Sequence, residues 1–166
     1  MTSQAQVNAG DKKIITFKVG DQVFAIDILL LIEVREWEEP TPIPGTSSYV
    51  RGVVNLRGIS VPILDLSERL GSGRTNTHAR SCVLVVEVAQ KRAGLLVDEV
   101  TGIVTIKVND IQPAPNLELK DPGAIDGLVQ LSANAIGSEA SRAPALTVTL
   151  LSLEALKVTR ELPLAA

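Results

Sequence analysis

The side chains in this sequence that could take part in covalent or metal chemistry are few and stand apart. His78 is the single histidine and lies in the polar stretch 72–80. Cys82 is the single cysteine and begins an apolar run, which is the setting of an inert core thiol. One histidine and one cysteine cannot form a zinc site of the usual spacing. The sequence therefore predicts no metal site and no cofactor.

The carboxylates have ordinary structural explanations. Asp27, Asp65 and Asp98 each follow an apolar, strand-like run, where such residues end strands or cap helices. The glutamates that flank Trp37 read as a solvated strip. There is no P-loop, dinucleotide fingerprint or nucleophile elbow. We therefore predict that the protein is not an enzyme. An enzyme would need a pocket with converging titratable groups, which a thermal-shift screen with metabolites would detect.

Composition excludes other classes. The 166 residues are 45% hydrophobic and carry a net charge of −3, with acidic and basic residues interspersed. A nucleic-acid binder usually has a basic face and stacking aromatics, and neither is visible here. No apolar run approaches the ~18–20 residues that span a bilayer, and the N-terminal residues do not resemble a secretory signal. These features, with the lone cysteine, predict a cytoplasmic protein that does not insert into a membrane.

Short β-like runs separated by turn signals must position these residues. Residues 14–19 and 22–28 form a predicted hairpin around Gly20, and residues 52–57 and 59–64 form another around Gly58. Asp65 and Glu68 have capping-box spacing and predict a short helix that ends at Gly71. Further strands are expected at 82–88, 93–97, 102–108, 127–131 and 145–151, and a last helix at 153–158. This pattern favours barrels or a sandwich over a βαβ fold.

A weak internal repeat sharpens that choice. The residues around Asp27 resemble those around Asp98, 71 positions later. Residues 52–56 resemble 127–131, 75 positions later, and 63–70 resemble 150–156. The repeat predicts two related lobes, each a small barrel on the same plan. The alternative is chance similarity between apolar β segments.

Residues 42–71 read PIPGTSSYVRGVVNLRGISVPILDLSERLG, which resembles the signature of the CheW family. Residues 24–28, 32–36 and 94–100 fit the same family, so the resemblance runs from about 14 to 158. It implies a mostly β fold of two five-stranded, SH3-like barrel lobes with short helices. The expected organisation is a flexible tail (1–12), a CheW-like domain (13–158) and a loose tail (159–166). Within the domain, we expect lobe 1 at about 13–80 plus the C-terminal helix, and lobe 2 at about 81–151.

The resemblance also implies a function. CheW proteins are adaptors without a catalytic site that couple chemoreceptors to the histidine kinase CheA. They bind the CheW-like regulatory domain of CheA through barrel faces, and the cytoplasmic hairpin tip of a chemoreceptor in the groove between lobes. With neither kinase modules nor a receiver, the chain resembles the stand-alone adaptor, expected to be monomeric when free. The alternative is a CheW-like regulatory or scaffold module of a different kinase array that does not control motility.

By the same resemblance, certain residues match functional positions. The apolar groove for the receptor is matched by Ile15, Ile28, Leu31, Val34 and Val100. Core packing is the alternative for each of them. Arg57 precedes Gly58 at the hairpin turn, and the equivalent arginine is implicated in receptor and kinase coupling, with Glu33 as its ionic neighbour. The alternative for this pair is an exposed salt bridge worth about 0–1 kcal/mol.

Overall fold

A computed structural model describes residues 10–113, 124–131 and 146–156 of the chain. The first strand begins at Asp11, two residues before the expected start of the domain at 13. Strand pairing reaches this point because the backbone of residues 11–13 pairs with residues 105–107. The loop at 132–144 and the tail at 159–166 lie outside the described residues.

Strands dominate the fold, and their bounds follow the turn signals in the sequence. The strands are β1 (Asp11–Val19), β2 (Gln22–Asp27), β3 (Leu31–Glu36), β4 (Val50–Leu56), β5 (Ile59–Asp65), β6 (Cys82–Val88), β7 (Lys91–Val97), β8 (Glu99–Lys107), β9 (Ile125–Leu131) and β10 (Leu146–Leu151). The short helices are η1 (Ile28–Leu30), α1 (Leu66–Arg69), η2 (Val108–Asp110) and α2 (Leu153–Leu156). Asp65 caps α1 as the capping spacing predicted, because its side chain accepts a hydrogen bond from the Glu68 amide.

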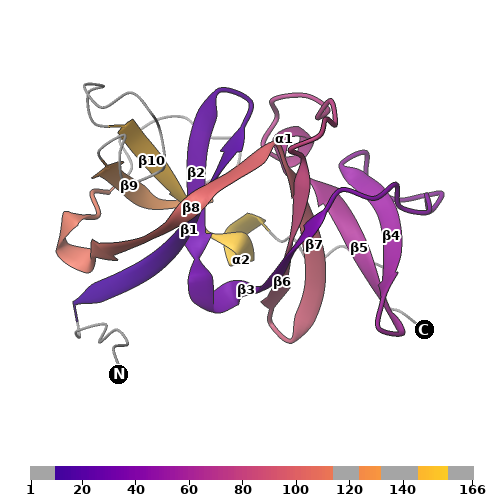
Figure 1. Ribbon diagram of the computed structural model, residues 1–166, viewed down its shortest axis with the longest axis horizontal. Helices are drawn as coiled ribbons and strands as arrows, with labels where there is room; N and C mark the ends of the chain where they lie inside the picture. Colours follow the sequence, from indigo (N-terminus) through magenta and orange to yellow (C-terminus); the bar gives the residue numbers. More distant parts are fainter. Residues whose placement is uncertain (1–9, 114–123, 132–145, 157–166) are drawn as a thin grey trace.

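The strands form two five-stranded sheets, which confirms the predicted mostly β fold (Figure 1). Sheet A has the order β8-β1-β2-β10-β9, and sheet B has the order β3-β6-β7-β5-β4. The division between them does not coincide with the expected boundary near residue 80. Strands β1 and β2 belong to sheet A, whereas β3, β4 and β5 belong to sheet B.

This exchange of strands follows from the internal repeat. The order β1 to β5 followed by α1 recurs as β6 to β10 followed by α2. After β2 the chain crosses to the other sheet, and after β7 it crosses back. Val19 pairs with Gln22 at the first hairpin and Val88 with Lys91 at its counterpart, so the offset here is 69 residues. The offset of 71 taken from Asp27 and Asp98 therefore differs by two from the offset that the strand pairing gives.

One shared apolar core joins the two sheets. It contains Phe17 and Ile26 from sheet A together with Leu84 and Leu95 from sheet B, all buried. Leu153 and Leu156 of α2 are buried in the same cluster. Arg69 of α1 also donates to the Leu156 carbonyl at 2.7 Å, which fastens one helix to the other. Each sheet has a second, smaller apolar cluster on its other face.

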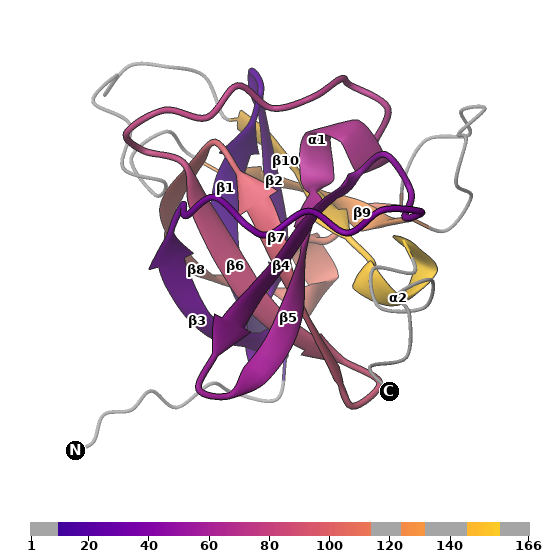
Figure 2. The same cartoon turned by 90° about the vertical axis from the view of Figure 1, so that its right-hand side faces the viewer.

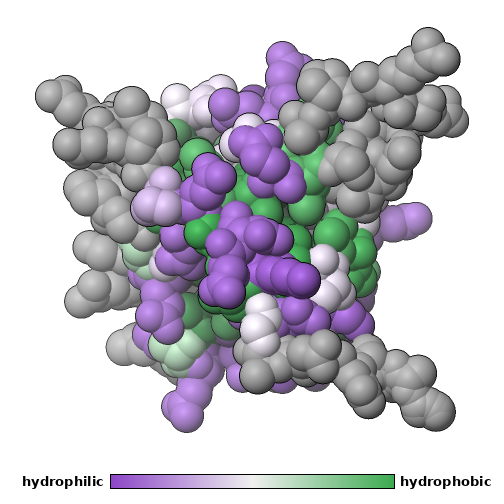
Figure 3. Space-filling model, turned by 90° about the vertical axis from the view of Figure 1, so that its left-hand side faces the viewer, coloured by the Kyte–Doolittle hydropathy of each residue, from purple (hydrophilic) through white to green (hydrophobic). Residues whose placement is uncertain are grey.

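One end of the molecule presents both hydrophilic and hydrophobic side chains. Seen from the sheet A end, hydrophilic side chains occupy the centre of the face, with hydrophobic side chains around them (Figure 3). None of the helices within the described residues is long and apolar enough to cross a membrane.

Candidate functional site

The turn between β4 and β5 holds Arg57 in a conformation that few side chains adopt. Arg57 has φ of 55° and Gly58 has φ of 86°, so two consecutive residues are left-handed. This geometry matches the twist of a tight hairpin, and Asn55 supports it by accepting a hydrogen bond from the Gly58 amide at 2.9 Å. The Arg57 side chain is 79% exposed. The fold therefore keeps this guanidinium in solvent at the tip of a rigid turn.

Glu33 on β3 is the ionic neighbour of Arg57, as predicted. The Arg57 Nη2 and Glu33 Oε2 atoms are 3.2 Å apart, and Arg35 donates to Glu33 Oε1 at 3.0 Å. The hydrogen bond from Arg35, helped by the charge of Arg57, holds the pKa of Glu33 below its usual value. Because β3 and β4 are the two edges of sheet B, this ion pair requires the sheet to curl until its edges approach.

Four of the five predicted groove residues meet at the core between the sheets. Ile15 is only 1% exposed and belongs to the core itself, so core packing is the correct interpretation for this residue. Ile28, Leu31 and Val100 are partly buried and pack against that core from outside. Val34 lies farther along β3 and is 46% exposed. The accessible part of the predicted site therefore consists of Ile28, Leu31, Val34 and Val100.

The repeat reveals one further residue that the sequence reading missed. Val34 pairs with Leu84, and Ile103 pairs with Ile15, which is the counterpart of Leu84 at the offset of 69. Ile103 is therefore the counterpart of Val34, and it is also exposed, at 58%. By the same offset, Leu31 is the counterpart of Val100. A repeat aligned at 69 residues would have identified Ile103.

These apolar residues lie on two edge strands on one side of the molecule. β3 and β8 both face the viewer in Figure 1 and both lie at the left in Figure 2, whereas α2 lies on the opposite side. β3 is bulged, since its pairing with β6 skips Ile32 between Leu31 and Glu33. Ile32 and Val34 are nevertheless both exposed. Two strands related by the repeat thus present apolar side chains beside the junction of the sheets.

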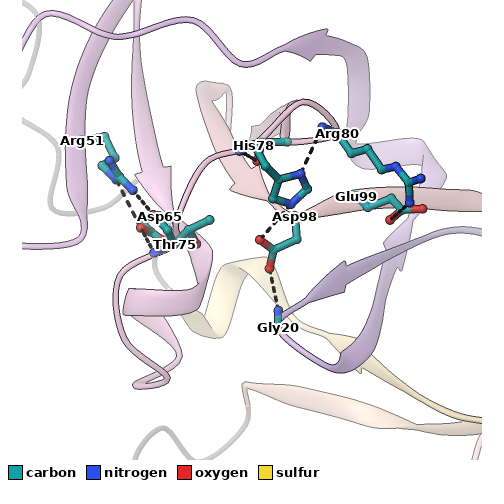
Figure 4. A network of polar contacts seen from close by, with 9 residues as sticks. Gly20, Arg51, Asp65, Thr75, His78, Arg80, Asp98 and Glu99 are labelled. Carbon is teal, nitrogen blue, oxygen red and sulfur yellow. Dashed lines mark hydrogen bonds and ion pairs between the residues drawn. The ribbon is translucent and has the colours of Figure 1, made fainter.

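The side chains that were considered for catalysis or metal binding make structural contacts here. His78 Nδ1 accepts a hydrogen bond from the Arg80 amide at 3.1 Å, and His78 Nε2 lies 3.6 Å from Asp98 Oδ1 (Figure 4). Asp98 also accepts a hydrogen bond from the Gly20 amide at 2.6 Å, so this chain of contacts links the loop before β6 to the first hairpin. Burial raises the pKa of the Cys82 thiol, which keeps it protonated. Within the described residues, no group of three or more potential metal ligands comes together.

Comparison with known proteins gives a consistent result. The family model described as the CheW-like domain matches residues 13–158. The chain is 42% identical over 118 residues to the chemotaxis protein CheW of Rhizobium meliloti, covering 70% of this chain and 76% of the relative. It is 41% identical over 111 residues to the probable chemotaxis protein CheW of Rhizobium etli, and the match covers 67% of this chain and 72% of that relative. The crystal structure of the scaffolding protein TtCheW from Thermoanaerobacter tengcongensis superposes with a TM-score of 0.75 at 28% identity, covering 91% of this chain and 97% of that one.

Proposed function

The chain belongs to the CheW family, and on that premise we propose that it is a non-enzymatic cytoplasmic adaptor that couples a chemoreceptor to the histidine kinase CheA. The observation that carries the proposal is the match to the CheW-like domain over residues 13–158, together with the family names of its relatives. Two surfaces suit protein partners, an apolar one on β3 and β8 and a charged one at the β4–β5 turn.

The receptor surface is the apolar pair of edge strands. A chemoreceptor tip is a helical hairpin, and a helix docks into a groove through apolar side chains spaced along one face. Leu31 and Val100 supply a half-buried floor, and Val34 and Ile103 supply exposed contacts on either side. We propose that the receptor lies between β3 and β8.

We expect Val34→Asp and Ile103→Asp each to weaken receptor binding about tenfold or more, because a charge buried against an apolar helix loses its hydration. The measurement is titration of the purified protein onto the receptor cytoplasmic region in membrane nanodiscs. Val108→Asp is the matched control, since Val108 is 48% exposed but lies in η2, away from the proposed groove. Equal binding by all three variants would contradict the placement of the receptor.

The second surface includes the turn that carries Arg57. The hairpin explains the left-handed backbone at Arg57, but an exposed ion pair contributes little to folding, so stability does not explain why an arginine stands there. A rigidly presented guanidinium is, however, well suited to a carboxylate on a partner. We propose that Arg57 contacts CheA or the receptor, with Glu33 fixing its direction.

Arg57→Ala is expected to leave the unfolding midpoint nearly unchanged but to weaken partner binding about tenfold, which corresponds to about 1.4 kcal/mol. Calorimetry with the CheW-like domain of a CheA from the same organism measures the kinase contact, and the receptor titration measures the other. Arg57→Asn serves as a second variant, because asparagine tolerates the left-handed conformation. Arg80→Ala is the matched control, since Arg80 is 74% exposed and also has an ion pair, with Glu99. If Arg57→Ala binds both partners like the unaltered protein, the pair is only a surface salt bridge.

A further inference from the structure

A pocket of about 290 Å³ opens beside α2 at one end of sheet A. Ile14 and Leu150 form part of its apolar wall, and Lys12, Asp27, Asp126 and Glu154 are among the charged residues that line it. Lys12 and Asp27 form an ion pair at 3.6 Å. Within the described residues, Asp126 and Glu154 have no ion-pair partner. The pocket therefore carries two carboxylates whose charge is not balanced.

The repeat places a different set of residues at the equivalent position of sheet B. In the β4–β5 hairpin, the pairing skips Arg51 between Val50 and Gly52. In the β9–β10 hairpin, the pairing skips Asp126 between Ile125 and Gly127 in the same way. Arg51 and Asp126 are thus the same bulge residue in the two copies.

In sheet B the site is filled from within the chain (Figure 4). The Arg51 guanidinium is 3.2 Å from the Asp65 carboxylate and donates to the Thr75 carbonyl at 2.6 Å. The side chains of Arg51 and Asp65 are only 9% and 0% exposed. A buried guanidinium and a buried carboxylate balance each other there, and the segment that carries Thr75 covers them.

In sheet A the charge at the bulge is reversed and the cation is missing. Asp126 replaces Arg51, and Ser152 replaces Asp65, with Ser152 accepting from the Ala155 amide at 3.3 Å much as Asp65 caps α1. Asp126 and Glu154 line an open pocket where the other sheet holds a guanidinium. The apolar wall suits the methylene stem of a long basic side chain, and the carboxylates of Asp126 and Glu154 suit its charged end.

We propose that this pocket binds an arginine side chain supplied by a partner protein. The planar guanidinium presents five donors in a fork that matches a carboxylate, and the equivalent site of sheet B already holds a guanidinium, which favours arginine over lysine. The site lies next to Ile28 and Leu31 through Asp27 and Leu30 of its lining, but its α2 side lies opposite β3 and β8, which carry the proposed receptor groove (Figures 1 and 2). It adds a third contact surface and does not depend on the proposed function.

The test is a titration of the isotope-labelled protein with N-acetyl-arginine amide, followed by backbone amide NMR. We expect saturable shifts at the amides around Ile14, Asp126 and Ser152, and no comparable shifts with the neutral analogue N-acetyl-citrulline amide. Asp126→Asn should weaken the response at least fivefold. Asp110→Asn should not change it, because Asp110 is exposed on η2 and does not line the pocket.

Three results would overturn the proposal. The first is an equal response to the citrulline analogue, and the second is an unchanged response in a folded Asp126→Asn variant. The third concerns Arg160→Gln, which removes the arginine nearest the end of the chain. If this variant binds the probe more tightly, the chain's own arginine competes for the pocket and the assignment to a partner fails. None of these results bears on binding to CheA or to a receptor, so the two proposals fail independently.

Discussion

Asp65→Ala is expected to lower the free energy of unfolding by about 3–5 kcal/mol, the usual loss when one member of a buried ion pair is removed. The Asp65 side chain is fully buried and accepts hydrogen bonds from Arg51 at 3.2 Å, the Thr75 amide at 2.8 Å and the Thr75 hydroxyl at 2.7 Å. Its removal leaves the Arg51 guanidinium buried without a carboxylate. It also uncaps α1 and frees the segment that carries Thr75. Urea denaturation followed by circular dichroism measures the effect.

The matched control is Asp27→Ala. Asp27 also caps a short helix, by accepting from the Leu29 amide at 2.9 Å, and also pairs with a cation, but its side chain is 29% exposed. We expect a loss of about 1 kcal/mol or less. The double variant Arg51→Met and Asp65→Ala should be less destabilised than the sum of the single variants, because no unpaired charge remains buried. Additive losses would show that charge pairing is not the reason for the effect.

Much of the fold could be predicted because local signals and the repeat agree. The hairpin turns, the Asp65 cap and most strands lie where the turn residues and apolar runs placed them. The division of strands between sheets could not be predicted in the same way. Whether the chain after β2 pairs with its own sheet or crosses to the other is decided by long-range pairing, here that of β3 with β6 and of β8 with β1.

The candidate site, like the fold, could be predicted only in part. The family resemblance predicted Arg57 and Glu33 as neighbours, and the structure places them together because sheet B curls until β3 approaches the β4–β5 turn. Ile15 could not be distinguished from a groove residue by its type. On β1, one face meets the shared core and the other meets the smaller core of sheet A, so Ile14 and Ile15 are both buried. Alternation of apolar and polar residues therefore does not identify an exposed face on this strand.

Gly52 and Gly127 occupy equivalent positions, each directly after the bulge residue of its hairpin. A Cβ atom on Gly127 would lie 2.7 Å from the Gln112 carbonyl oxygen, because the chain after β8 forms a bridge with β9 at this point. A Cβ atom on Gly52 would collide with the Thr41 carbonyl oxygen, where the chain after β3 forms a bridge with β4 in the same way. Each glycine permits a loop backbone to lie directly against a bulged hairpin.

We expect Gly127→Ala to lower the free energy of unfolding by about 1–3 kcal/mol, as overpacking does. Gly52→Ala should cost about 1–3 kcal/mol more, because Gly52 also has φ of 143°, which strains any residue with a Cβ atom. Gly102→Ala is the control on β8, where a Cβ atom would meet nothing within 4 Å. Its effect should stay within about 0.5 kcal/mol. Restricting the unfolded chain would make Gly102→Ala neutral or slightly stabilising. Similar losses for all three variants in urea denaturation would therefore contradict the prediction, because they would not follow the close approach of the backbone at Gly52 and Gly127.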